Sequence, residues 1–128
     1  MKIRPNELRI GNLLRDSISK TPLRVVEIKE LGFVTYVIDR TKYPLANGWS
    51  CEPIPLTEEI LLKAGFEYWG GYKHKLLRGV RGAVLCEVDD EYWLLNNSYK
   101  SLYVKFKYLH QLQNLVFSLS GKELEIEL

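Results

Sequence analysis

The stretch LRVVEIKELGFVTYVID, residues 23–39, decides the fold of the first half of the chain. Its first part alternates around Val26 and Ile28, with charged residues facing outward between and after them, which is typical of a half-buried strand. A Leu-Gly step then indicates a turn, and the residues after it are almost all β-branched or aromatic, as strands favour. We therefore predict strands at residues 23–30 and 33–39.

Shorter candidate strands lie on both sides of this pair. Residues 12–18 form the first, and residues 49–54 form a closing strand that follows an Asn-Gly turn signal. Together the strands predict a small antiparallel sheet over residues 8–55. We expect this sheet to be curled and barrel-like, with an SH3-like barrel as one alternative.

The second half combines helices with a β-meander. Thr57 is predicted to cap a short helix that ends at Gly65, because its hydroxyl can accept from free backbone amides and glycine adopts the left-handed conformation. The meander strands are expected at residues 68–77, 83–88, 92–95 and 102–108.

The strongest helix pattern covers residues 109–119 and is followed by an alternating segment. The apolar residues of the helix share one stripe at helical spacing, formed by Leu109, Leu112, Leu115, Val116 and Leu119. Off this stripe lies a polar patch that either meets a partner or faces water, formed by Gln111, Gln113 and Asn114. The segment KELEIEL, residues 122–128, alternates between glutamates and apolar residues, which predicts a half-buried final strand.

These patterns predict an α+β fold in one domain spanning residues 1–128. A β-rich, barrel-like half at residues 1–55 and a helix-meander-helix-strand half at residues 56–128 would share one core. Apolar residues make up 46% of the chain and charged residues 27%, which is typical of a globular domain. A chain of 128 residues buries enough surface to fold without a metal or disulfides.

The sequence favours a cytoplasmic protein that has no membrane association. The first residues lack the continuous apolar region of a signal peptide, and the apolar runs are far shorter than the ~20 residues of a membrane-spanning helix. Two cysteines, Cys51 and Cys86, are too few for a disulfide framework, so we expect reduced and buried thiols.

Three segments of the chain together resemble a known group of proteins. They are NELRIGN at residues 6–12, PIPLTEEILLKAGF at residues 53–66 and YLHQLQNLVFSLSG at residues 108–121. The group consists of small hypothetical proteins of gut anaerobes, their phages and their mobile elements. The resemblance implies an accessory protein of a mobile element, and it carries over no activity and no functional residue.

Motifs for metal binding and catalysis are absent from the sequence. The potential soft ligands Cys51, His74, Cys86 and His110 are far apart, without a CxxC or HxxxH pair, so we predict no metal and no cofactor. The chain has no GxSxG elbow and no phosphate-binding glycine motif. We expect a protein that is not an enzyme, while a small catalytic site assembled from His74, His110 and Cys51 stays an alternative.

The segment YWGGYKHKLLRGVR, residues 68–81, interleaves aromatic rings with cations. Single-stranded nucleic acid is bound by this combination, since rings stack on bases and cations follow phosphates. The candidate residues are Trp69, Tyr72, Lys73, Lys75, Arg78 and Arg81, with Lys105 and Lys107 as a possible extension. The alternative is a solvated strand face, and a net charge of +2 indicates weak binding at best.

Three functions are therefore expected, in this order. The first is a non-catalytic interaction module that binds a protein partner of the mobile element or its host. The second is weak binding of single-stranded nucleic acid, and the third is the small enzyme. A homodimer that pairs through the exposed final strand is a further alternative.

Overall fold

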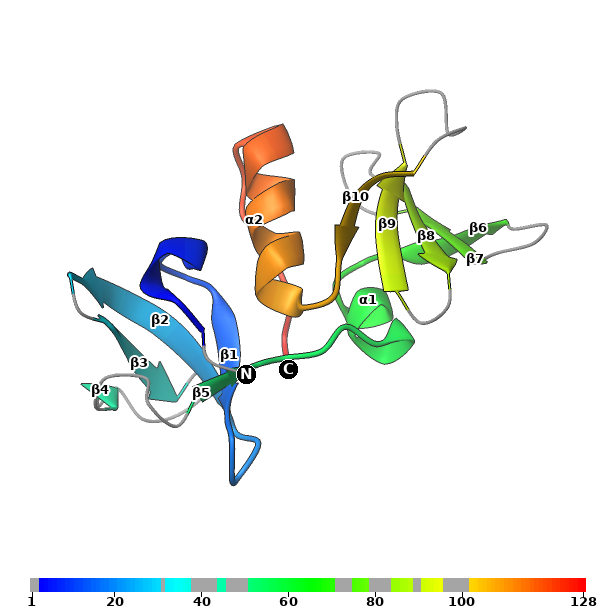
Figure 1. Cartoon of the computed structure of the whole chain (residues 1–128). Helices are drawn as coiled ribbons and strands as arrows, with labels where there is room; N and C mark the ends of the chain where they lie inside the picture. The colour runs from blue at the N-terminus through cyan, green and yellow to red at the C-terminus, as the bar shows by residue number, and fades with distance from the viewer. Residues whose placement is uncertain are drawn as a thin grey trace. The chain divides into compact units, whose positions relative to one another are not determined.

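The computed structural model describes residues 3–30, 32–37, 44–45, 51–70, 75–78, 84–88, 91–95 and 102–128. Helices and antiparallel strands are both present, so the fold is α+β as predicted (Figure 1). Contacts divide the chain into two compact units. The first contains Met1–Pro55 and Tyr108–Leu115, and the second contains Leu56–Lys107 and Val116–Leu128. The expectation of one domain with a shared core stays a prediction.

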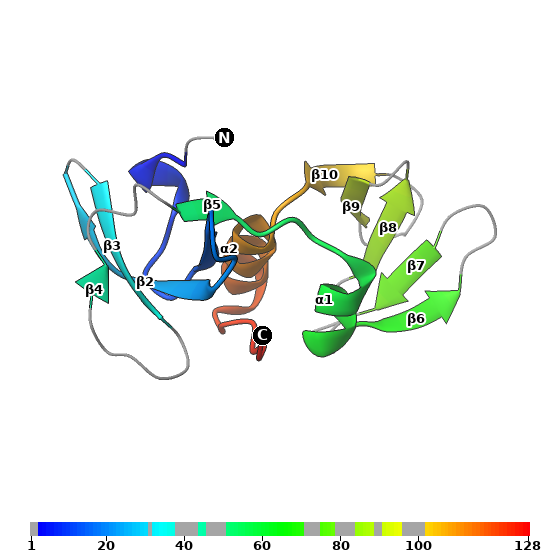
Figure 2. The same ribbon diagram turned by 90° about the horizontal axis from the view of Figure 1, so that it is seen from below.

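The first unit is built on a curled five-stranded antiparallel sheet (Figure 2). A 3-10 helix, η1, comes first at Pro5–Glu7. The strands are β1 (Leu13–Asp16), β2 (Pro22–Lys29), β3 (Gly32–Val37), β4 (Pro44–Leu45) and β5 (Cys51–Pro53). Their order is β4-β3-β2-β1-β5, so the chain forms a meander and its last strand returns to pair with the first. The predicted barrel-like sheet is thus confirmed, and its SH3-like form stays a prediction.

The buried face of β2 differs from the predicted one. The register between β2 and β3 shifts between Val25 and Glu27, so Val26 is an extra residue that disrupts the ladder. Val25 is fully buried, whereas Ile28 lies at the surface. The inward assignment is wrong for Val26, because Val25 takes the core-facing position before the bulge. Beyond the bulge, Ile28 is opposite the buried Phe33 and so lies on the core face of the sheet, although it is 39% exposed.

The core of the first unit joins residues that are distant in the sequence. Ile3 and Leu8, on either side of η1, pack in one cluster with Leu14 of β1, Val25 of β2 and Phe33 of β3. The segment before β1 therefore belongs to the folded core. Burial of its two apolar side chains contributes roughly 1.5–3 kcal/mol each.

The second unit begins with helix α1, Glu58–Lys63, whose ends confirm the predicted boundaries. The Thr57 hydroxyl accepts a hydrogen bond of 3.2 Å from the Ile60 amide at the N-terminus. Gly65 follows the C-terminus with a φ of +93°, a conformation that few other residues adopt. Between these ends, Leu61 is fully buried, so packing supports a helix too short to be stable by itself.

Next comes a second five-stranded antiparallel meander (Figure 2). Its strands are β6 (Glu67–Gly70), β7 (Lys75–Arg78), β8 (Val84–Val88), β9 (Glu91–Leu95) and β10 (Leu102–Phe106), and they follow chain order across the sheet. The prediction of one strand over residues 68–77 is wrong, because β6 and β7 are separate strands that pair antiparallel. Glycines inside a strand weaken it, because they have no side chain to pack. Here β6 ends at Gly70, the first residue of the Gly70-Gly71 step.

Both edges of this second sheet are irregular, whereas its centre is regular. The register shifts between Tyr68 and Gly70 in the β6–β7 pair, and between Leu102 and Val104 in the β10–β9 pair. The β7–β8 and β8–β9 pairs show no shift. Bulges at edges hinder the addition of another strand, so these two edges are poorly suited to pairing with a second chain.

Helix α2, Leu109–Ser120, starts at the predicted residue and ends before Gly121, which has a φ of +71°. Its predicted apolar stripe is wrong at one end, because Leu119 is 63% exposed. His110 and Gln113 are buried instead. The buried face of the helix is therefore rotated, relative to the predicted apolar stripe, toward polar residues that the periodicity places in solvent.

Residues 122–128 form no strand, so the predicted final strand is wrong. Leu124 is buried, Ile126 is half-buried, and the glutamates between and beside them are exposed. Alternate burial arises from contact along one side of the segment and does not require a neighbouring strand. In the part of the chain that the structure describes, no helix has the length and hydropathy to span a membrane.

We expect Thr57→Ala to lower the free energy of unfolding by about 1 kcal/mol, because the Ile60 amide loses its acceptor. Chemical denaturation monitored by circular dichroism measures this loss. Thr57→Ser keeps the hydroxyl and is the control, and equal losses in the two variants would contradict the capping role.

Candidate functional site

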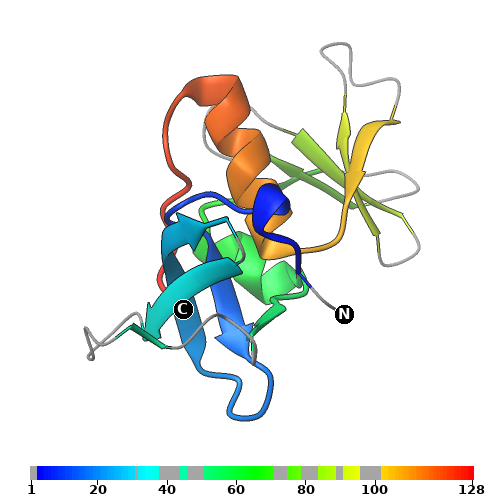
Figure 3. The same ribbon diagram turned by 60° about the vertical axis from the view of Figure 1, so that its left-hand side comes forward.

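The densest polar cluster of the first unit joins the loop after η1 to α2. Asn114 lies at its centre and uses both atoms of its side-chain amide. Its Oδ1 accepts from Arg9 Nε at 3.0 Å and from Asn12 Nδ2 at 2.9 Å. Its Nδ2 donates to the Glu7 carbonyl oxygen at 3.1 Å. Figure 3 shows η1, in dark blue, beside the first turns of α2.

Gln113 makes a second set of bonds to the same loop. Its side-chain oxygen accepts from the Leu13 amide at 2.8 Å, and its Nε2 donates to the Gly11 carbonyl at 3.4 Å. Gln113 is only 2% exposed, so these bonds satisfy a buried amide that would otherwise cost about 1–3 kcal/mol. Asn12, also fully buried, orders the loop by accepting from the Arg9 amide at 2.7 Å.

The structure thus corrects the interpretation of the polar patch on α2. Gln113 and Asn114 neither face water nor await a partner, because they bind the chain's own loop. Gln111 is exposed, and its side chain accepts from the Tyr108 amide at 3.0 Å, which caps the start of the helix. Carboxamides do not ionise at ordinary pH, so the side chains of Gln113 and Asn114 stabilise the structure and do not act as an acid or a base.

An ionisable pair beside this cluster is formed by Glu7 and His110. His110 is 1% exposed, and its Nε2 lies 3.8 Å from Glu7 Oε1, too far for a hydrogen bond. Neither Glu7 Oε1 nor His110 Nδ1 has a hydrogen-bond partner among the residues that the structure describes. The imidazole stacks on Tyr108 with ring centres 6.0 Å apart. Burial lowers the pKa of His110 to about 4, so the ring is neutral at pH 7.

The cysteines show no sign of activation as nucleophiles. Burial raises the pKa of both Cys51 and Cys86, whereas a reactive thiolate needs a lowered one. Cys51 Sγ lies 3.7 Å from the Thr35 hydroxyl, and neither cysteine forms a disulfide. Of the proposed assembled catalytic site, His74 lies outside the described residues. In the described ranges, no group of three or more His, Cys, Asp or Glu side chains is placed to hold a metal.

The basic and aromatic candidate residues are only partly described. Tyr72, Lys73 and Arg81 lie outside the described residues. Trp69 lies in β6, while Lys75 and Arg78 are the first and last residues of β7. In the register of the sheet, Lys75 is opposite Glu87 and Arg78 is opposite Val84. Positions 75 and 78 therefore belong to opposite faces of the sheet, because successive residues alternate.

A different pairing of cation and ring, which the sequence pattern missed, lies at the other end of the sheet. Lys105 and Trp93 are cross-strand partners, and Lys105 Nζ lies 5.7 Å from the centre of the Trp93 ring. The same ammonium is 3.6 Å from Glu91 Oε2. Lys105 is thus engaged by a ring and a carboxylate of β9. Trp93 and Lys105 lie twelve positions or more beyond the 68–81 segment, and only the strand register brings the two residues together.

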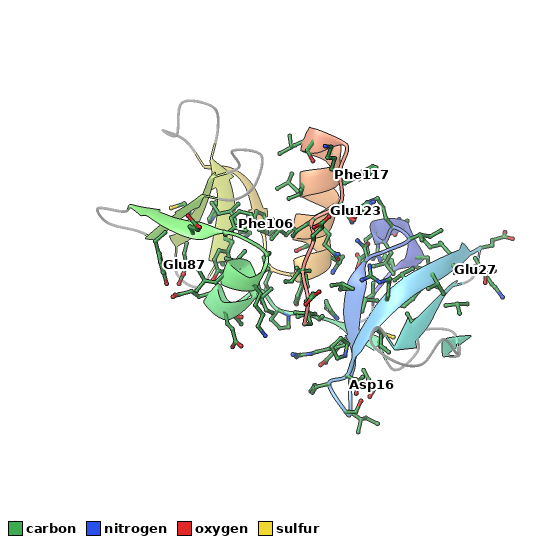
Figure 4. All side chains as sticks on the ribbon, turned by 180° about the vertical axis from the view of Figure 1, so that it is seen from behind. Asp16, Glu27, Glu87, Phe106, Phe117 and Glu123 are labelled. Carbon is green, nitrogen blue, oxygen red and sulfur yellow. The ribbon has the colours of Figure 1, made fainter. Side chains whose placement is uncertain are left out.

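The most exposed large apolar residue described is Ile18, at the tip of the turn between β1 and β2. It is 88% exposed, and the turn that carries it is well ordered by hydrogen bonds. Asp16, which is labelled in Figure 4, is the residue that orders the turn. Its Oδ1 accepts from the Ile18 and Ser19 amides, both at 2.9 Å. The Asp16 carbonyl accepts from the Lys20 amide, and the Asp16 amide donates to the Thr21 carbonyl, each at 2.9 Å.

Two cations beside this turn share one carboxylate partner. Arg15 Nε and Lys20 Nζ lie 2.6 Å and 2.5 Å from the same oxygen of Glu52 on β5. The Lys20 ammonium first, and then the Arg15 guanidinium, lower the pKa of the Glu52 carboxyl. Lys20 has a φ of +60°, unusual for a residue other than glycine. The segment DSISK carried a signal for this turn, since Asp and Ser bond their own backbone.

Comparison with known proteins adds no family to these observations. No family model matches the chain, and no curated protein and no solved structure shows a significant match to it.

We expect Asn114→Ala to lower the free energy of unfolding by about 3 kcal/mol, because Arg9, Asn12 and the Glu7 carbonyl each lose a bond. Urea denaturation measures the change. Ser118→Ala, on the exposed side of the same helix, is the control and should change stability by less than about 0.5 kcal/mol. Similar losses in both variants would show that the network contributes little.

Acidification should destabilise the fold through His110. An unfolded chain protonates histidine near pH 6.5, whereas the buried ring does so only near pH 4, so the unfolded state binds more protons between these values. The free energy of unfolding is then highest above pH 6.5 and falls as the pH drops to 4, by about 3 kcal/mol from this residue. Chemical denaturation at a series of pH values from 4 to 8 measures this dependence. The free energy of unfolding should fall less steeply with decreasing pH in His110→Phe than in the unmodified protein. Identical pH dependence in the two proteins would show that His110 is not the cause.

Proposed function

We propose that the protein is a non-catalytic interaction module that binds a protein partner through the turn between β1 and β2. The observation that carries this proposal is the 88% exposure of Ile18 on a hydrogen-bonded turn. An apolar side chain held out on an ordered turn loses little conformational freedom on binding, so most of its burial contributes to affinity. Interfaces are dominated by a few such anchoring residues.

The charges near the turn favour a protein partner over nucleic acid at this surface. Glu52 engages Arg15 and Lys20 together, so the two cations nearest the tip already have a carboxylate partner. An isoleucine also offers no flat ring for stacking on a base. The partner that fits this surface is a protein with an apolar pocket for Ile18. Because the contact is apolar, the affinity should depend only weakly on salt concentration.

The cluster around Asn114 supports the non-catalytic part of the proposal. Its amides are bonded to the backbone and to one another, which stabilises the fold and leaves no activated acid, base or thiol there. The resemblance of residues 6–12, 53–66 and 108–121 supports an accessory role in a mobile element. The presence of only two cysteines supports a cytoplasmic location. Weak binding of single-stranded nucleic acid and a small enzyme remain alternatives.

Site-specific photocrosslinking tests this proposal. A photoreactive residue at position 18 should yield a defined adduct in extract from the source cells, and unlabelled protein should compete for it in a saturable manner. Ile18→Asp as the competitor should be at least about tenfold weaker, as expected of an anchoring residue. Because Ile18 is exposed, this substitution should change stability by less than about 0.5 kcal/mol.

Ile10 is the matched control, because it is 61% exposed on a different turn of the same unit. Ile10→Asp should compete as well as the unmodified protein. The proposal fails if position 18 gives no competable adduct, or if the two aspartate variants are equally impaired.

A further inference from the structure

Residues 122–128 have the alternating sequence pattern of a β-strand, but in the described structure they pair with no other strand. In the described part of the chain, Leu124, Glu125, Ile126, Glu127 and Leu128 make no backbone hydrogen bond. Figure 1 shows the residues after α2, in red, as an uncoiled trace. Such a segment has backbone donors and acceptors available for pairing with another chain.

One side of this segment is already anchored in the second unit. Leu124 is buried and Ile126 is half-buried, whereas Glu125 and Glu127 are exposed. A pocket of about 410 Å³ lies beside Leu124, and its other apolar lining comes from Ala64 and Gly65 after α1 and from Val116 of α2. The rest of its lining is polar and consists of Lys63, Ser120, Lys122, Glu123 and Glu125. The segment therefore has a buried apolar side, an acidic side, and room beside Leu124 for an additional side chain, whose apolar part would contact Ala64, Gly65 and Val116.

The charges of the segment decide against a second copy of the same chain. Every pairing of two copies that keeps the apolar residues on one side also places glutamate opposite glutamate, because both alternate with period two. Like charges directly opposite each other in a strand pair are destabilising. A strand with lysine or arginine at the facing positions would instead gain from each opposite-charge pair, by roughly 0.2–1 kcal/mol.

We propose that residues 122–128 are a docking strand for an extended segment of a partner protein in which apolar residues alternate with Lys or Arg. The partner pairs its backbone with residues 124–128, sets its cations against Glu125 and Glu127, and places an apolar side chain in the pocket beside Leu124. This surface belongs to the second unit and is independent of the turn at Ile18.

A labelled peptide of alternating lysine and valine, equal in length to residues 122–128, is the probe. Fluorescence anisotropy should show saturable binding that weakens as ionic strength rises from about 0.05 to 0.5 M, because the facing charges are near the surface. Glu125→Lys combined with Glu127→Lys should lower the affinity at least tenfold. The same double variant should acquire binding to a peptide of alternating glutamate and valine, which the unmodified protein does not bind.

A matched control separates docking from general attraction of charge. Glu27→Lys with Glu30→Lys changes the net charge by the same amount at an exposed part of the first unit, and it should leave peptide binding unchanged. Amide hydrogen exchange at residues 124–128 should slow when the peptide binds, which an interaction of side chains alone would not cause.

Several results would overturn the proposal. A peptide of the same composition with its lysines and valines in separate blocks must bind much more weakly, and equal binding would indicate simple charge attraction. Equal loss of binding in the Glu27 and Glu30 variant would have the same meaning. A dimer of the unmodified protein that Glu125→Lys with Glu127→Lys abolishes would identify a second copy as the occupant. None of these results would alter the crosslinks at Ile18.

Discussion

The first unit depends on the side-chain amide of Asn114, which makes hydrogen bonds to three groups at once. Asn114 accepts from Arg9 and Asn12 and donates to the Glu7 carbonyl, so one residue of α2 holds the whole loop between η1 and β1. The loop must be held there, because Ile3 and Leu8 on either side of η1 belong to the core that β1, β2 and β3 share. Without these bonds, two apolar anchors would be attached to a segment with no regular structure of its own beyond η1.

This constraint also explains which face of α2 is buried. A helix placed by apolar residues alone would turn Leu119 inward and Gln113 outward. The observed rotation buries Gln113 and exposes Leu119, because the amide groups of the helix and the loop satisfy each other. Buried polar groups are costly when unpaired, and a satisfied network of them therefore specifies one orientation. The same rotation buries His110 beside Glu7 and makes the ring neutral.

The exposed features of the two units differ in chemistry. At the turn that carries Ile18, the two cations Arg15 and Lys20 both contact Glu52, and the tip is apolar, so its binding should come mainly from burial. Residues 124–128 present backbone groups that make no hydrogen bond in the described part of the chain, together with the carboxylates of Glu125 and Glu127, so their binding should come from hydrogen bonds and charge. Both edges of the second sheet carry register shifts, so a strand of another protein should pair more readily with residues 124–128 than with these edges.

Local chemistry in the sequence was sufficient for the α+β class, the curled first sheet, the cap at Thr57, the terminator at Gly65 and the start of α2. The cap, the terminator and the helix start depend on residues within a few positions of one another, and the strands of the first sheet are visible in their own short residue patterns. Only the tertiary structure decided the bulge at Val26, the separate strands β6 and β7, the missing final strand and the partners of Asn114. Arg9 and Asn114 are 105 residues apart. The periodicity of a helix shows which of its residues share a face, but it does not show which other part of the chain packs on that face. The bonds across such distances depend on how the whole chain packs, which no local pattern contains.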